Sequence, residues 1–196
     1  MFYIVGLGNP GEKYARTRHN IAWQVLDIAL QAWGMPSLIE DKKISGRTTG
    51  GNLGEQFVQV LYPDTFMNNS GAAVAKFVPR NELSQLIVVH DDIDLPLGEV
   101  KVVKGRGAGG NNGVASIIQK VGSKEFVRIR IGIAPKALFT GETKRPAGGG
   151  PLERFVLKSF GILEQRQLPA VYEKAKIAIE IVVQEGVEAA MNTCNT

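Results

Sequence analysis

Two short apolar runs, each followed by polar residues, limit what this chain can fold into. Residues 2–7 and 86–89 are apolar throughout and too short for helices, so we expect both to be buried strands. Residues 20–33 are apolar over most of a helical length and stop before Gly34, a pattern typical of a largely buried helix. Strands that alternate with helices predict an α/β layer fold.

The remaining segments continue this alternation along the 196 residues. We expect further strands at 57–61, 99–103 and 126–133, and further helices at 70–78, 112–121 and 163–185, with a break near Pro169. Residues 140–151, rich in glycine, proline and charge, are expected to form a mobile loop. The prediction is a single-domain, three-layer α/β fold with a twisted mixed, mostly parallel sheet flanked by helices.

Composition narrows the class of protein and its location. Apolar residues make up 44% and charged residues 21%, which is typical of a soluble globular protein, and no apolar run approaches membrane-spanning length. The first residues lack the basic start of a signal peptide, and Cys194 has no second cysteine to pair with, so we expect a cytoplasmic protein. The net charge is only +4, but basic residues cluster between 101 and 145, which suits a nucleic-acid partner as well as it suits a solvated surface.

Two glycine-rich segments resemble nucleotide-binding motifs and then depart from them. Residues 6–11 match G-x-G-x-x-G, but the next residues do not open a helix, and Asp27 lies within a predicted helix instead of after a second strand. Residues 105–113 carry Asn111 and Asn112 where a P-loop has its lysine and hydroxyl residue. We expect no nucleotide cofactor, although a glycine-rich loop before a helix N-terminus still suits an anion or a polarised carbonyl.

The polar residues that follow the two apolar strands are expected to meet at one edge of the sheet. Carboxyl ends of neighbouring parallel strands form ligand sites in α/β folds, and here they carry Asn9 and the aspartates at 91–94. An aspartate that holds one ring nitrogen of His19, one of only two histidines, would leave the other nitrogen basic. Because no G-x-S-x-G motif is present and the one cysteine lies near the chain end, such a base would act on water.

Neutral amides near this edge can hold a carbonyl. Asn68 and Asn112 stand beside predicted helix starts and can stabilise an oxyanion without competing for the proton. The combination describes hydrolysis of an activated carbonyl, most easily an ester, and the basic stretch suggests phosphates on one side of that ester. Taken singly, each residue favours a structural role instead: His19 at a helix start, Asn9 in a turn, Asn68 and Asn112 as helix caps, and the aspartates as a solvated strand end.

Five blocks of residues, in order and at matching spacing, resemble the signatures of the bacterial-type peptidyl-tRNA hydrolase family. The blocks lie at 6–20, 65–71, 90–98, 109–113 and 128–133, and the resemblance runs from residue 3 to about 160. Any one block alone would be a weak match, whereas five in order are specific.

This resemblance implies a monomeric hydrolase that releases stalled peptides from tRNA, without metal or cofactor and without a membrane partner. It implies that His19 is the catalytic base and that Asp91 orients it. Arg130, together with Lys101 or Lys104, is implied to hold the tRNA phosphate, and residues 140–160 to form a mobile cover over the cleft, before C-terminal helices at 163–190. The residues implied to bind the peptide and the tRNA 3′ end are Asn9, Tyr14, Phe66, Met67, Asn68 and Asn112.

The chain departs from the family pattern mainly in the glycine loop. Asn111 stands where the family usually carries a histidine, Arg106 interrupts the glycine run, Val103 replaces a common phosphate-binding lysine, and Ala22 replaces a usual glycine. We expect none of these to touch the base or its carboxylate, and therefore expect them to affect tRNA binding more than chemistry. They leave open an alternative function, a non-catalytic RNA-binding relative that serves RNA splicing, although the intact candidate site argues against it.

Overall fold

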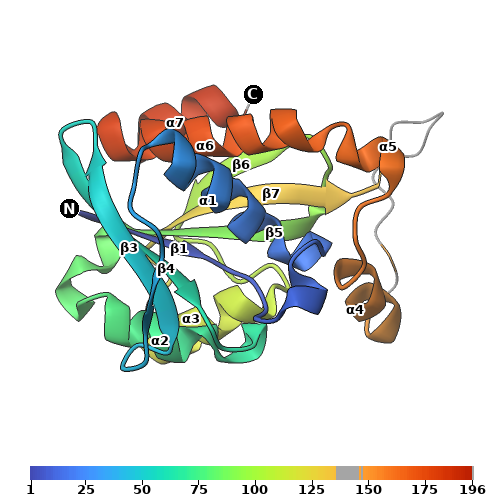
Figure 1. Cartoon of the computed structure of the whole chain (residues 1–196), viewed down its shortest axis with the longest axis horizontal. Coiled ribbons are helices and arrows are strands. Elements are labelled where there is room, and N and C mark those ends of the chain that lie inside the picture. The colour runs from blue at the N-terminus through green and yellow to red at the C-terminus, as the bar shows by residue number, and fades with distance from the viewer. Residues whose placement is uncertain (136–145, 147, 196) are drawn as a thin grey trace.

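The computed structural model describes residues 1–135, 146 and 148–195 as three layers, a mixed sheet with helices on both faces (Figure 1). The sheet has seven strands in the order β2-β3-β4-β1-β5-β7-β6. Their bounds are β1 Phe2–Gly6, β2 Ile39–Asp41, β3 Gly46–Leu53, β4 Gln56–Pro63, β5 Leu86–Pro96, β6 Val100–Lys104 and β7 Val127–Ala134. The predicted three-layer α/β architecture is confirmed.

Strand directions explain why the sheet is both mixed and mostly parallel. The four central strands β4, β1, β5 and β7 run parallel to one another, and β3 and β6 run antiparallel to their inner neighbours. Because β2 is antiparallel to β3, it shares the direction of the central four, so five of the seven strands point the same way.

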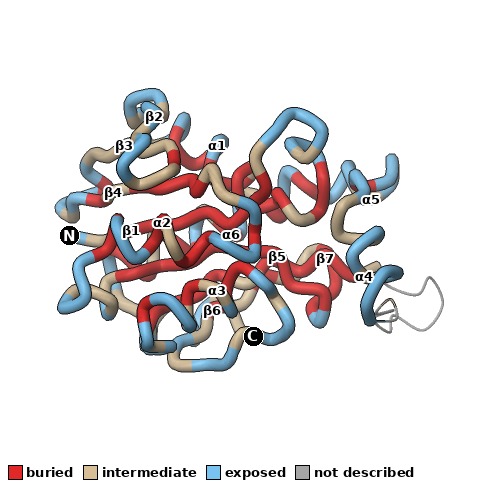
Figure 2. Tube along the Cα trace, turned by 90° about the horizontal axis from the view of Figure 1, so that it is seen from below, coloured by how far each residue is buried: buried red, intermediate tan, exposed pale blue. Residues whose placement is uncertain are grey.

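Alternate residues of the central strands feed two hydrophobic cores. Ile4, Ile87 and Val89 pack with helices α1 (Ile21–Ala32), α6 (Leu168–Gln184) and α7 (Val187–Cys194) on one face. Tyr3 and Val88 pack with α2 (Ser70–Phe77) and α3 (Asn112–Val121) on the other. The central strands are accordingly buried along almost their whole length (Figure 2), as their apolar sequences predict.

The carboxyl ends of the parallel strands are surrounded by short elements. Three of the four 3₁₀ turns in the described chain follow these strands, at Glu12–Tyr14 (η1), Arg18–Asn20 (η2) and Met67–Asn69 (η3). The fourth, at Arg80–Gln85 (η4), leads into the amino end of β5. Helices α4 (Gly150–Val156) and α5 (Ile162–Gln165) lie at the same end of the molecule (Figure 1). None of the described helices combines the length and hydropathy needed to cross a membrane.

Three sequence expectations need correction. The strand predicted at 86–89 does not end at His90 but continues to Pro96, because residues 90–92 pair with residues 130–132 of β7. The hairpin of β2 and β3 was not expected, since residues 46–53 are polar and glycine-rich and become a strand by pairing with β4. Residues 150–156 of the expected cover loop form a helix, whereas residues 136–145 and 147 lie outside the described chain.

The other predicted elements are confirmed with small shifts of their ends. The predicted break near Pro169 falls just before it, since α5 ends at Gln165 and Pro169 occupies the first turn of α6, where its missing N–H costs nothing.

Candidate active site

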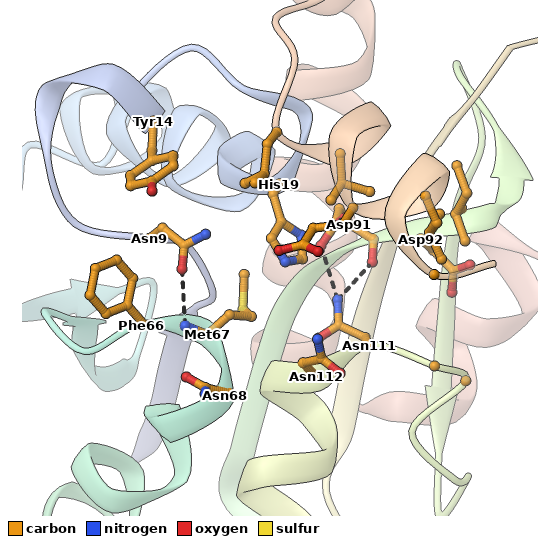
Figure 3. A pocket seen from close by; sticks show the side chains of 18 of the residues that line it. Asn9, Tyr14, His19, Phe66, Met67, Asn68, Asp91, Asp92, Asn111 and Asn112 are labelled. Atoms are coloured by element: carbon orange, nitrogen blue, oxygen red, sulfur yellow. Dashed lines mark hydrogen bonds and ion pairs between the residues drawn. The ribbon is translucent and has the colours of Figure 1, made fainter. Parts of the chain in front are cut away.

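A pocket of about 710 Å³ opens at the carboxyl ends of β1 and β5. All eight residues predicted for catalysis and for binding of the peptide and tRNA 3′ end line it: Asn9, Tyr14, His19, Phe66, Met67, Asn68, Asp91 and Asn112. Figure 3 shows how side chains from the end of β1, η1, η2, η3, β5 and the start of α3 converge there. The sheet topology therefore brings together residues that lie more than a hundred positions apart in the chain.

His19 and Asp91 form a side-chain hydrogen bond inside the pocket. Nδ1 of His19 lies 2.8 Å from Oδ2 of Asp91. The side chains are 12% and 4% exposed, so the contact is shielded from bulk water. No described residue forms a hydrogen bond with Nε2 of His19, so this nitrogen is available to another molecule.

Opposing effects set the pKa of His19. Burial disfavours the charged imidazolium and lowers the pKa, whereas the negative charge and the hydrogen bond of Asp91 raise it. The net result is a pKa above the ordinary value of 6.5. Asp91 therefore fixes which ring nitrogen carries the proton and makes the imidazole bind a second proton more readily.

Asn111 touches the carboxylate of Asp91, which corrects the expectation that the changed residues of the glycine loop stay clear of it. Nδ2 of Asn111 donates to Oδ1 of Asp91 at 2.9 Å, as Figure 3 shows. Asn111 also caps α3, because its Oδ1 accepts from the backbone N–H groups of Gly113 and Val114. Asn112 is therefore not the cap, and its side chain is exposed in the pocket.

Asn9 is held in one orientation by two partners. Its Oδ1 accepts from the backbone N–H of Met67 at 2.9 Å (Figure 3), so its Nδ2 is left as a donor within the pocket lining. Asn20 fixes the Asn9 backbone, since its carboxamide accepts from the N–H and donates to the C=O, both at 2.9 Å. No sequence pattern singles out Asn20, which is completely buried and has its effect through residue 9.

The remaining predicted binding residues form one wall of the pocket. Tyr14 and Phe66 meet edge to face, with ring centroids 6.4 Å apart. Phe66 is 59% exposed, whereas Met67 beside it is buried. Asn68 is exposed within η3 and does not cap α2.

The predicted phosphate-binding residues lie outside the pocket, on β6 and β7. Nε of Arg130 donates to Oδ2 of Asp92 at 2.7 Å, and Asp92 lines the pocket. Lys101 stands directly opposite Arg130 in the β6–β7 register, so both project from the same face of the sheet. Lys104 pairs with Val127 and projects from the other face, so the structure does not bring it to Arg130.

Arg128 and His90 are two buried polar residues of the same face that sequence reasoning left without a role. Arg128 is 3% exposed, and its Nε has no hydrogen-bond partner in the described chain. Its pKa is lowered by burial and by the nearby charge of Arg130, against the opposing charge of Asp92. His90 is 1% exposed, its Nδ1 donates to the backbone oxygen of Asp91 at 2.7 Å, and its pKa is lowered mainly by burial.

The glycine-rich motif at residues 6–11 allows helix α1 to pack closely against the end of β1. A Cβ at Gly8 would come within 2.7 Å of the Trp23 ring, and one at Gly6 within 2.6 Å of Leu26. Trp23 Nε1 donates to the Gly6 backbone oxygen at 2.8 Å. The glycines thus let α1 lie against the end of β1, which explains a dinucleotide-like pattern without the helix that such a motif requires.

Arg18, next to His19, joins the pocket to the C-terminal part of the chain. Its guanidinium donates to the backbone oxygen of Ser159 at 2.8 Å and to the Glu164 carboxylate at 2.7 Å. It also lies over the ring of Phe155, 4.3 Å from the centroid. Helix α4, which contributes Leu152 to the pocket lining, is therefore fixed to η2.

Among the described residues no group of three or more histidine, cysteine, aspartate or glutamate side chains is arranged to hold a metal ion.

Comparison with known proteins gives one consistent result. The model of the peptidyl-tRNA hydrolase family matches residues 3–196. Peptidyl-tRNA hydrolase of Citrifermentans bemidjiense is 41% identical over 194 residues, covering 98% of this chain and 96% of that protein. The protein of the same name from Thermodesulfovibrio yellowstonii is 38% identical over 199 residues, covering 100% and 99%. The crystal structure of peptidyl-tRNA hydrolase from Acinetobacter baumannii aligns over 100% of this chain and 95% of its own, with a TM-score of 0.88 and 31% identity.

Proposed function

The chain belongs to the peptidyl-tRNA hydrolase family, and from this membership we infer that the pocket around His19 is where the ester of peptidyl-tRNA is cleaved. As a member of the family the chain is an ester hydrolase that separates peptide from tRNA. The observation that carries the assignment to this pocket is the 2.8 Å contact between His19 and Asp91 inside it.

His19 is the general base in this proposal. Asp91 holds Nδ1, so Nε2 accepts a proton from water while the water oxygen adds to the ester carbonyl carbon. The bond between that carbon and the ribose oxygen then breaks, and the imidazolium returns its proton to the ribose oxygen. The negative charge of Asp91 stabilises the imidazolium while it holds this proton.

The asparagines act on the carbonyl oxygen. Asn9 is best suited, because Met67 occupies its Oδ1 and leaves Nδ2 as a donor whose orientation is fixed before substrate binds. Asn68 and Asn112 add exposed carboxamides to the same pocket and neither caps a helix, so both are available to substrate. The neutral amides do not compete with His19 for the proton.

The aromatic wall is proposed to bind the apolar parts of the substrate. Phe66 exposes most of its ring beside Tyr14 and Met67, an arrangement that suits a peptide side chain or a base of the tRNA 3′ end. Helix α4 at the rim is proposed to cover the bound ester, within a single domain that comprises residues 1–196.

The phosphates are proposed to bind on the side of β6 and β7. Lys101, Arg128 and Arg130 share one face there, and the only carboxylate bonded to them in the described chain is that of Asp92. The excess positive charge and the unpaired Nε of Arg128 support an anionic partner. Lys104 points away and is expected to contribute less. We further propose that the protein acts as a monomer in the cytoplasm, as the resemblance to the family and the composition predict.

Replacement of His19 tests the proposal. His19→Ala should abolish hydrolysis of purified peptidyl-tRNA, by a factor on the order of 10³ or more, while tRNA binding measured by filter retention stays within about twofold. Wild-type turnover by this variant would remove His19 from the mechanism. Absence of turnover in the wild-type protein, with tRNA binding intact, would favour the non-catalytic alternative.

Arg130→Ala tests the phosphate side. We expect KM to rise about tenfold at low salt with kcat nearly unchanged, and the salt dependence of KM to become shallower because a phosphate contact is lost. Lys104→Ala is the matched control on the same strand pair, with an expected change in KM under twofold. Equal effects of the two replacements would contradict the assignment of this face.

A further inference from the structure

We propose that Asn111 is a positioning residue that orients the carboxylate of Asp91 toward His19. The inference rests on the proposed function, because it takes His19 as the base and Asp91 as its partner. Nδ2 of Asn111 donates to Oδ1 of Asp91 at 2.9 Å, and the same nitrogen lies 3.3 Å from the backbone oxygen of Asp91. One amide group therefore contacts Asp91 at two points.

Helix α3 prevents the Asn111 amide from turning over. Its Oδ1 accepts from the backbone N–H of Gly113 at 3.0 Å and of Val114 at 3.1 Å. Backbone N–H groups only donate, so the carboxamide oxygen has to face the helix and the nitrogen has to face Asp91. The N-terminus of α3 thus sets the direction from which Asp91 receives a hydrogen bond.

The contact fixes the rotation of the Asp91 carboxylate. Its two oxygens have different partners, Asn111 on Oδ1 and His19 on Oδ2, and rotation of the carboxylate breaks both bonds. Without Asn111, a nearly buried oxygen loses its donor and the carboxylate is free to turn away from the imidazole. Outer partners of this kind determine how a base is aimed at its substrate.

The donor at this position carries no charge at any pH. Asn111 therefore supports Asp91 equally in acid and in base, whereas a histidine in its place would change its charge and add a second titration. The charged or titratable groups around the pair come from η2, β5, β7, α4 and η1, and they are His19, His90, Asp92, Arg130, Glu153 and Tyr14. Of these, His19 is the group that contacts the Asp91 carboxylate.

Two replacements separate the cap from the contact with Asp91. Asn111→Asp keeps an oxygen for the N–H groups of Gly113 and Val114 but turns a second carboxylate toward Asp91. We expect kcat for peptidyl-tRNA to fall about 10- to 100-fold with KM within about threefold, and the acidic limb of the kcat profile to move to higher pH, because added negative charge stabilises the imidazolium. Asn111→Ser also keeps a capping oxygen but is too short to reach Asp91, and kcat should fall about tenfold.

Two alternative results would overturn the inference. If KM rises in these variants with kcat unchanged, Asn111 binds substrate and does not position Asp91. A lower Tm with both kinetic constants unchanged would make it a helix cap alone.

Matched controls keep the two proposals separate. Ser116→Ala removes the hydrogen bond from the Gly71 N–H to α3 without contacting Asp91, and should lower Tm with kcat unchanged. His19→Ala is measured in parallel. If His19→Ala is inactive and Asn111→Asp is as active as wild type, only the role of Asn111 is wrong, whereas an active His19→Ala removes the base itself.

Discussion

The two histidines of this chain contact the same aspartate, yet their pKa values are shifted in opposite directions. His19 bonds to the Asp91 carboxylate, and His90 donates to the Asp91 backbone oxygen. The pKa of His19 is raised because the carboxylate outweighs burial, whereas the pKa of His90 is lowered because burial outweighs its neighbours. His19 faces the pocket, but His90 lies in the interior, with a buried Nε2 that has no partner in the described chain.

This difference shows that a neighbouring acidic side chain does not by itself make a histidine a base. A carboxylate compensates the imidazolium charge, whereas a carbonyl oxygen only fixes the neutral tautomer. Alternation along β5 decides which contact is possible, because successive side chains project from opposite faces of the sheet.

When each histidine is replaced by asparagine, the loss of activity should be far larger at His19 than at His90. In His19→Asn the amide nitrogen can still donate to Asp91, but nothing remains to accept a proton from water. We expect kcat/KM for peptidyl-tRNA to fall about 10³- to 10⁴-fold. Circular dichroism and tRNA binding check that the fold persists, and activity within tenfold of wild type would exclude His19 as the base.

Asp91→Asn should give the next largest effect. The replacement keeps the shape of the side chain but removes the charge that stabilises the imidazolium, and it allows the wrong tautomer. We expect kcat to fall about 10²- to 10³-fold in a steady-state hydrolysis assay. A change in KM alone would show that Asp91 holds substrate and does not orient His19.

The pH profile provides a third test. In the wild type, kcat/KM should rise with pH as His19 loses its proton, with an inflection above 6.5 because its folded-state pKa is raised. In the residual activity of Asp91→Asn the inflection should move below 6.5, since burial then acts unopposed. An inflection that stays in place would assign the acidic limb to another group.

His90→Asn should have the smallest effect on turnover. The amide nitrogen takes the place of Nδ1 and can donate to the Asp91 carbonyl, so kcat should stay within about threefold. The ring atoms that are removed should cost about 1–3 kcal/mol of stability.

The effect of pH on the free energy of unfolding should have opposite signs at the two histidines. The lowered pKa of His90 costs stability as pH falls below 6.5, whereas the raised pKa of His19 adds stability below 6.5 that is lost as pH rises through its folded-state value. Urea unfolding at acidic and neutral pH measures both, and His90→Asn should lose less stability in acid than wild type.

The elements predicted from sequence were those with a strong apolar pattern. Residues 2–6 and 86–89 carry enough buried side chains to specify strands locally, and α1 and α3 have clear ends at Gly34 and Gly122. The hairpin at 39–53 and the polar half of β5 were missed because pairing with β4 and β7 decides their conformation. No local pattern encodes a partner strand.

In the candidate site, too, residues with a local sequence signal could be predicted, whereas residues that depend on distant partners could not. Residues with distinctive chemistry, such as His19 and Asn9, were found because their spacing within recognisable blocks was preserved. Asn20 and Asn111 were missed because their roles consist of bonds to Asn9 and Asp91, which only the folded chain brings near. The bond between Arg130 and Asp92 likewise depends on the β5–β7 pairing.

Titration of both imidazoles by NMR in wild type and Asp91→Asn tests the central claim most directly, because the chain holds only two histidines. The structure predicts that His19 titrates with a pKa above 6.5, which falls in Asp91→Asn. It also predicts that the pKa of His90 lies below 6.5 and that its neutral ring carries the proton on Nδ1. A pKa of His19 below 6.5, or one that Asp91→Asn leaves unchanged, would contradict the proposal that Asp91 prepares His19 as the base.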